Sequence, residues 1–153
     1  MATRIKPAVA HLYESDFYAW SKAQADLLRA GRFGDLDLGH LIEEVDDLGE
    51  PLYRSTCSRV RTIIEHLSKL QFSPAAAARP GWIETLYTQR SELEGELTPS
   101  LRPRVEPALP GPYGQARRNT ARSLEAYGEQ AAADALPATC PYGFDQITGD
   151  WLP

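Results

Sequence analysis

Two polar side chains occupy helix positions at which the spacing of neighbouring apolar residues predicts an apolar side chain. Gln24 falls near the centre of the apolar face of one expected helix, and Arg90 falls near the centre of the apolar face of another. At about 100° per residue, both positions face the protein interior. A polar group in an apolar interior needs a hydrogen-bonding partner. The sequence therefore predicts a polar cluster inside a helical core.

Of the two residues, Arg90 needs a partner more strongly, because removing the partner of a buried charge costs on the order of 3–5 kcal/mol in stability. We predict that its partner is a carboxylate of the acidic helix expected over residues 37–48, bound through two of the three guanidinium nitrogens. Glu44 lies on one flank of that helix's apolar face, beside Leu48, and is the first choice. Asp46, on the other flank, is the second. Such a pair is compatible with a structural ion pair and with part of a reactive site.

The histidine and acidic residues do not form a metal-binding motif. His66 lies on the flank of a helix expected over residues 51–72, where a lone histidine is typical of packing or a satisfied hydrogen bond. If the chain folds back near Gly49, Glu44 and His66 are offset by about 15 Å along the helix axis and cannot share a metal ion. His40 and Glu44 supply only two ligands, and HExxH and EF-hand patterns are absent. We predict no metal site, and the sequence identifies neither a cofactor nor a catalytic residue.

Helical periodicity runs through the chain, and no stretch alternates with the period of two typical of a strand. Helices are expected over residues 16–31, 37–48, 51–72 and 82–97, shortly after Thr98–Pro99, and over residues 113–135. Ser15 or Asp16 would begin the first of these helices, and Gly31 would end it. The pattern predicts one all-α domain over residues 1–153, a bundle of five or six helices. Residues 1–12 are expected to form a loose arm, and residues 136–153, with aromatics between prolines, a packed cap.

Composition narrows the classes of protein further. The formal net charge is -5, 42% of the residues are hydrophobic and 24% are charged, which is typical of a soluble globular domain. Residues 35–50 are rich in Asp and Glu and contain no Lys or Arg, whereas most of the charged residues over 99–122 are arginines. The negative total argues against non-specific nucleic-acid binding, and no apolar run approaches the length of a membrane span. Cys57 and Cys140 lack a CxxC motif, so that we expect a cytoplasmic protein without structural disulfides.

An ordered series of short motifs extends over nearly the whole chain. They are Tyr13-Glu14-x-Asp16-Phe17-x-x-Trp20, Gln24, Leu27-Leu28-Arg29, Leu41-Ile42-Glu43-Glu44-Val45, His66-Leu67-x-Lys69, Trp82-x-x-Thr85, Gln89-Arg90, Pro99-Ser100-Leu101 and Cys140-Pro141-Tyr142. The series resembles the bacterial domain-of-unknown-function family number 29, whose members are small and helical and have no established activity. The resemblance places the family's polar signature on Trp20, Gln24, Glu43, Glu44, His66, Lys69, Trp82, Gln89 and Arg90. Gly81 and Leu70 depart from the family pattern.

Two hypotheses for function follow. The first is a helical binding or interaction module, in which Gln24, Glu44 and Arg90 fix the helix register and shape a small pocket, with His66 left open as a further member. Its partner would be another protein or a small polar ligand, and homo-oligomerisation is compatible with a small bundle. The second is a small-molecule or metal-dependent enzyme with acid–base or hydrolytic chemistry in a pocket lined by Trp20, Glu44, His66 and Arg90.

Overall fold

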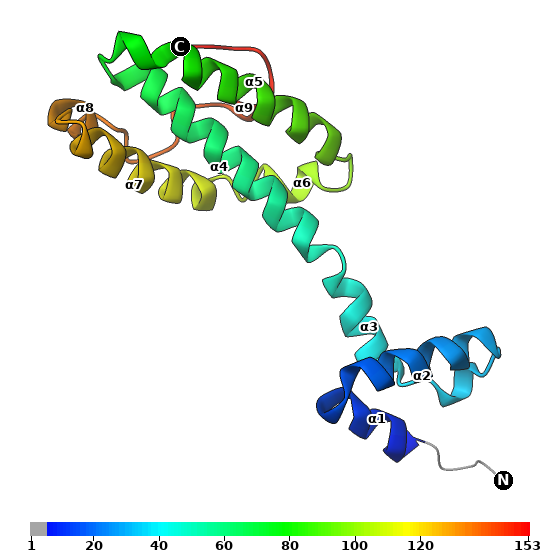
Figure 1. The fold of residues 1–153 in the computed structure, drawn as a ribbon. Coiled ribbons are helices and arrows are strands. Elements are labelled where there is room, and N and C mark those ends of the chain that lie inside the picture. The colour runs from blue at the N-terminus through cyan, green and yellow to red at the C-terminus, as the bar shows by residue number, and fades with distance from the viewer. Residues whose placement is uncertain (1–5) are drawn as a thin grey trace. The chain divides into compact units, whose positions relative to one another are not determined.

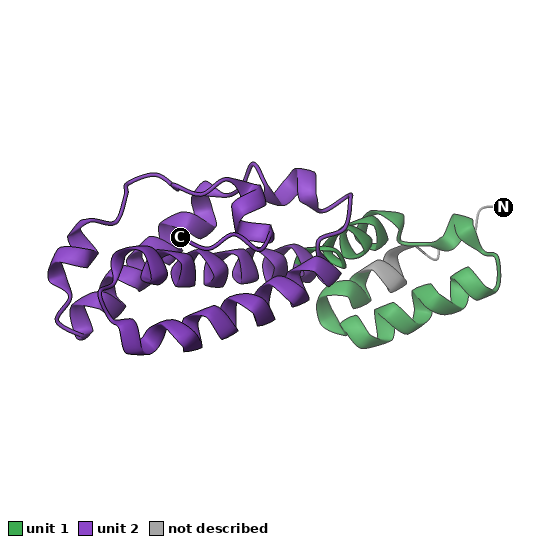
Figure 2. Ribbon diagram, turned by 90° about the horizontal axis from the view of Figure 1, so that it is seen from above, with its two compact units in different colours: residues 1–50 green, residues 51–153 purple. Residues whose placement is uncertain are grey.

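The computed structural model describes the backbone of residues 6–153 and the side chains of residues 11–153. Every regular element in this part of the chain is a helix (Figure 1), which confirms the predicted all-α fold. The chain divides into two compact units, residues 1–50 (unit 1) and residues 51–153 (unit 2), which Figure 2 distinguishes by colour. The expectation of a single domain stays a prediction.

Unit 1 contains three helices in its described part. They are α1 (Lys6–Ser15), α2 (Phe17–Arg29) and α3 (Leu38–Asp47), with the 3-10 turn η1 (Phe33–Asp35) between α2 and α3. Asp16 begins α2, because its side chain accepts a hydrogen bond of 2.9 Å from the backbone N–H of Ala19. Gly31 follows the helix at φ 68°, a left-handed conformation that favours glycine. Both predicted ends of this helix are thus confirmed.

The expected loose arm over residues 1–12 needs a correction. From Lys6 onward this segment is the helix α1, which packs against α2. Residues 1–5 lie outside the described part of the chain. The end of α1 packs against the rest of unit 1 through Tyr13, which contacts both α2 and α3. The ring centroid of Tyr13 lies 4.9 Å from that of Trp20.

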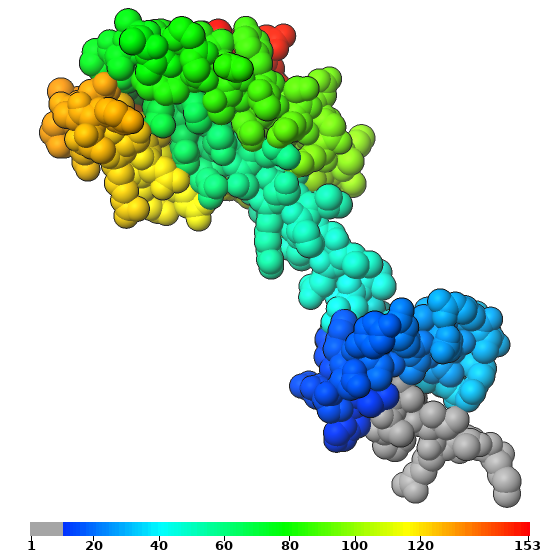
Figure 3. Space-filling view, in the orientation of Figure 1, coloured from blue at the N-terminus to red at the C-terminus, as the bar shows by residue number. Residues whose placement is uncertain are grey.

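Unit 2 is built around the long helix α4 (Glu50–Phe72). The elements that follow are η2 (Ala76–Ala78), α5 (Arg79–Glu96), α6 (Arg102–Val105), α7 (Pro110–Ala126), α8 (Gln130–Asp134) and α9 (Phe144–Thr148). The space-filling view shows that side chains fill the spaces between the ribbons of α4, α5 and α7 (Figure 3). Val60, Ile63, Ile64 and Leu67 of α4 are 0% exposed and form the centre of this core.

The bundle has more and shorter helices than the five or six expected. The helix expected over residues 113–135 is divided into α7 and α8, because Gly128 between them has a φ of 78°. The segment after α8 packs as predicted, since Tyr142, Phe144 and Ile147 are buried in the same core as α4. Within the described residues, no helix is both long enough and apolar enough to span a bilayer.

Candidate functional site

Two of the predicted site residues meet at the start of α3, in unit 1. Trp20 and Gln24 are 2% and 1% exposed. The indole Nε1 of Trp20 donates a hydrogen bond of 3.1 Å to Asp37 Oδ2, and Gln24 Oε1 accepts one of 2.9 Å from the backbone N–H of Asp37. The prediction that Gln24 is a buried polar residue with a hydrogen-bonding partner is thus confirmed for Oε1, whereas Nε2 is buried without one.

Asp37 connects this pair to the rest of the cluster. Asp37 precedes α3, but its carboxylate makes no capping hydrogen bond to the helix. It lies 2.7 Å from His40 Nδ1 and accepts a hydrogen bond from Trp20. The hydrogen bond to Asp37 raises the pKa of His40 against the opposing effect of burial. Burial alone would raise the pKa of Asp37, but the hydrogen bonds from His40 and Trp20 outweigh it and lower that pKa.

Tyr13 closes the cluster on the other side. Its ring stacks on His40 with 3.8 Å between ring centroids, and its hydroxyl donates a hydrogen bond of 2.6 Å to Glu44 Oε1. This hydrogen bond, with burial, raises the pKa of Tyr13 to about 12. We name these residues the unit 1 polar cluster: Tyr13, Trp20, Gln24, Asp37, His40 and Glu44. Sequence reasoning missed Tyr13, Asp37 and His40 as members, although Tyr13 belongs to the first of the ordered motifs.

The contacts of the polar cluster determine how α3 is oriented. His40 and Glu44 contact Tyr13, so these two polar residues lie on the inner side of α3. Of the five large apolar side chains over residues 38–48, Leu41 is half-buried. The other four lie outside: Leu38, Ile42, Val45 and Leu48 are 61%, 54%, 62% and 74% exposed. An amphipathic surface helix ordinarily buries such a stripe against its own protein. The last signature residue of this unit, Glu43, is also exposed on α3.

Arg90 is buried as predicted, with 5% of its surface exposed. The predicted carboxylate partner is wrong, for Glu44 and for Asp46 alike. Arg90 Nε donates to the carbonyl oxygen of Ile147 at 3.0 Å, and Nη2 donates to the carbonyl oxygens of Gln146 and Trp151 at 2.7 and 2.9 Å. Burial lowers the pKa of Arg90, which the charge of Asp150 opposes. Its Nη1 is buried and has no partner.

Gln89 and His66 take part in local contacts of unit 2. Gln89 Oε1 accepts a hydrogen bond of 3.3 Å from Arg59, which also pairs with Glu92 and, at 2.8 Å, with Glu96. His66 Nδ1 lies 2.8 Å from the carbonyl oxygen of Thr62, one turn earlier in α4. The hypothesis of a satisfied hydrogen bond at His66 is therefore confirmed. Burial lowers the pKa of His66 despite this hydrogen bond.

The two histidines therefore give opposite dependences of stability on pH. Because the pKa of His40 is raised above 6.5, its contribution to the stability of unit 1 is present below pH 6.5 and lost as the pH rises through the raised value. Because the pKa of His66 is lowered below 6.5, its contribution to unit 2 is present above pH 6.5 and lost as the pH falls through the lowered value.

An NMR titration of the imidazole resonances measures both pKa values in one sample. We expect His40 to titrate above 6.5 and His66 below it. The substitution Asp37→Asn should move only the titration of His40, downward, because it removes the carboxylate from a single histidine. Equal midpoints for the two histidines would contradict the assigned environments.

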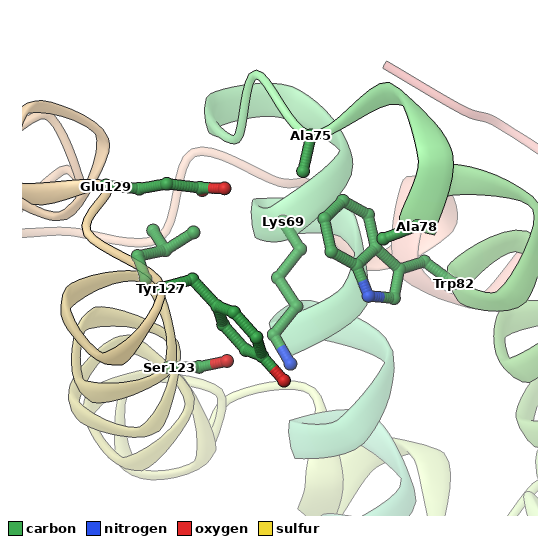
Figure 4. Close-up of a pocket in the computed structure, with 8 residues that line it drawn as sticks. Lys69, Ala75, Ala78, Trp82, Ser123, Tyr127 and Glu129 are labelled. Atoms are coloured by element: carbon green, nitrogen blue, oxygen red, sulfur yellow. The ribbon is translucent and has the colours of Figure 1, made fainter.

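Lys69 and Trp82 line a common pocket in unit 2, which Figure 4 shows in close-up. The cavity has a volume of about 280 Å³. Its other lining residues are Ala75, Ala78, Ser123, Leu124, Tyr127 and Glu129. Sequence reasoning found Lys69 and Trp82 but missed Ser123, Tyr127 and Glu129, because it extended one helix through Gly128 and so placed no pocket wall there.

The nine signature residues thus divide between the two units. Trp20, Gln24, Glu43 and Glu44 belong to unit 1, and His66, Lys69, Trp82, Gln89 and Arg90 belong to unit 2. Within unit 2, Lys69 and Trp82 share a pocket, whereas His66, Gln89 and Arg90 have separate hydrogen-bonding partners. Across the described part of the chain, no three His, Cys, Asp or Glu side chains are grouped so that they could hold a metal ion.

Comparison with protein families gives one match. The family model of DUF29, a domain of unknown function, matches residues 12–152. The chain belongs to the DUF29 family. Neither the curated proteins nor the solved structures include a match to this DUF29 chain. Membership of DUF29 accounts for the ordered motifs and leaves the function to be inferred from the site geometry.

Proposed function

We propose that the protein is an interaction module, acting in the cytoplasm, whose helix α3 binds an amphipathic helix of another protein. The observation that carries this proposal is the exposed apolar stripe of α3. Its polar residues His40 and Glu44 face α1, while the apolar stripe formed by Leu38, Ile42, Val45 and Leu48 is more than half exposed along its length. Contiguous exposed apolar side chains of this kind mark interaction sites.

The charge next to the stripe identifies the chemistry of the partner. Glu43, Asp46 and Asp47 are exposed on α3, and residues 35–50 contain no Lys or Arg. A partner helix with Lys or Arg beside its own apolar stripe would match both the apolar and the acidic part of this surface. A second copy of the chain, packing stripe against stripe, would bring acidic residues together. The acidic flanks therefore favour a basic amphipathic helix over self-association.

The proposal is tested by binding of a synthetic helix to the isotope-labelled full chain. The probe is a peptide of about 18 residues, long enough to form a helix, with a Leu stripe flanked by Lys. We expect saturable NMR shift changes concentrated at residues 38–48, and weaker binding at high salt. Ile42→Asp should weaken binding about tenfold or more, because it places a carboxylate in the apolar contact.

Two controls make the result specific. Leu28→Gln removes an exposed apolar side chain of α2, 46% exposed, and should leave binding unchanged. A peptide of the same pattern flanked by Glu should bind at least tenfold more weakly. Equal binding of the two peptides would refute the basic partner. A concentration-dependent dimer in sedimentation that Ile42→Asp abolishes would replace it with self-association.

A further inference from the structure

The pocket of unit 2 contains one basic and one acidic side chain that do not neutralise each other. Lys69 comes from α4 and Glu129 from the turn before α8. In the described part of the chain, neither side chain forms an ion pair, and Glu129 Oε2 is buried without a hydrogen-bonding partner. A buried carboxylate oxygen without a donor is a costly arrangement. The pocket thus contains a cation and an anion that have no ion-pair partner among the described residues.

Aromatic and apolar side chains form the walls around these charges. Figure 4 shows Trp82 on one side of Lys69, and Tyr127 and Glu129 extending toward the cavity from the other. Ala75, Ala78 and Leu124 add apolar surface. Tyr127 is 82% exposed, a large value for an aromatic ring that lines a pocket. An aromatic side chain exposed in this way provides a face on which an apolar group of a ligand packs.

We propose that this pocket binds a small zwitterion with an apolar body, such as a free amino acid. The carboxylate of the ligand binds the ammonium group of Lys69. The ammonium group of the ligand donates to the carboxylate of Glu129, whose Oε2 is buried. The apolar body of the ligand packs against Trp82 and Tyr127. The volume of about 280 Å³ suits a molecule of this size, because pockets for larger, drug-sized ligands begin at about 300 Å³. All of these residues belong to unit 2, so this inference stands independently of the α3 interaction surface.

The test uses the full chain, three probes that share a phenyl body and differ in charge, and one aliphatic zwitterion. L-Phenylalanine and 6-aminohexanoate carry both charges, with different separations between them. Phenethylamine lacks the carboxylate, and 3-phenylpropionate lacks the ammonium group. We expect at least one zwitterion to bind saturably with a Kd of about 1 mM or below, an affinity accessible to a ligand of this size. The NMR signals of Lys69, the Trp82 indole and residues 123–129 should shift.

The variants separate charge recognition from a general loss of structure. Lys69→Met should reduce the affinity for L-phenylalanine about tenfold, to that of phenethylamine, and should leave phenethylamine binding unchanged. Glu129→Gln should likewise reduce it to the affinity of 3-phenylpropionate. Lys22→Met, at an exposed lysine of unit 1, and Glu125→Gln, at an exposed position of α7, are the matched controls.

The result that would overturn the proposal is equally specific. No saturable binding of either zwitterion up to about 10 mM would refute it, since a ligand that weak gains less than about 3 kcal/mol. Binding of a singly charged probe as tight as that of the zwitterion would refute the paired recognition of charge. Binding that survives both Lys69→Met and Glu129→Gln would place the ligand elsewhere.

Discussion

Replacing Arg90 by Met is expected to destabilise unit 2 by about 3 kcal/mol, the loss that follows when buried acceptors lose hydrogen bonds from a charged donor. The guanidinium is 5% exposed and donates to the carbonyl oxygens of three residues near the end of the described chain, Gln146, Ile147 and Trp151. Methionine fills a similar volume but donates no hydrogen bond. Urea denaturation followed by circular dichroism gives the change in the free energy of unfolding.

Hydrogen exchange shows where the stability is lost. In Arg90→Met, residues 144–151 should exchange faster than the rest of unit 2, because their carbonyls lose the donor that holds the segment. Arg118→Met removes an exposed arginine of α7 and should change the stability by less than about 0.5 kcal/mol. If Arg90→Met unfolds at the same urea concentration as the wild-type protein, the guanidinium does not hold the segment.

Replacing Trp20 by Ala should remove about 3–5 kcal/mol from the stability of unit 1, the range observed for buried tryptophans. In the described part of unit 1, Trp20, Gln24 and Leu36 are the buried residues, so the indole is most of its interior. The substitution also removes the donor to Asp37 Oδ2. NMR spectra should then show collapsed shift dispersion for residues 11–48.

Tyr18→Ala is the matched control for this experiment. Tyr18 lies on the same helix and is 72% exposed, so its removal should leave the spectrum of unit 1 dispersed. Residues 60–70 of α4 belong to unit 2, and the described residues that form the core around them all come from unit 2. Their signals should keep native dispersion in Trp20→Ala, and loss of both sets of signals would contradict the independence of the two cores.

The sequence was sufficient to predict the all-α fold, the ends of α2 and the burial of Gln24 and Arg90. Asp16 and Gly31 mark the ends of α2 because a side-chain cap and a left-handed glycine are local effects. The burial of Gln24 and Arg90 follows equally from helical spacing. Each of these inferences depends on residues within or next to one helix, so the local sequence pattern is enough to make it.

The partners of these residues could not be predicted in the same way. Arg90 binds backbone carbonyls, which every residue carries and no sequence motif marks. The apolar period of α3 shows that the helix has two faces, but the contacts of Tyr13 with His40 and Glu44 determine which face points inward. The unit 2 pocket depends on the bend at Gly128, so a helix drawn through that glycine conceals it.

The carbonyl oxygens that accept hydrogen bonds from Arg90 have a consequence for the order in which the chain folds during synthesis. They lie 56 to 61 positions after the arginine, so α5 leaves the ribosome well before its partners have been translated. The contacts of the unit 1 polar cluster, in contrast, all fall within the first 50 residues. Unit 1 is therefore expected to fold while unit 2 is still incomplete, as N-terminal units do during translation. A ribosome stalled before residue 146 would carry a nascent chain with a native unit 1 and with an α5 that lacks the hydrogen-bonding partners of Arg90. We expect chaperones to bind such a chain at α5.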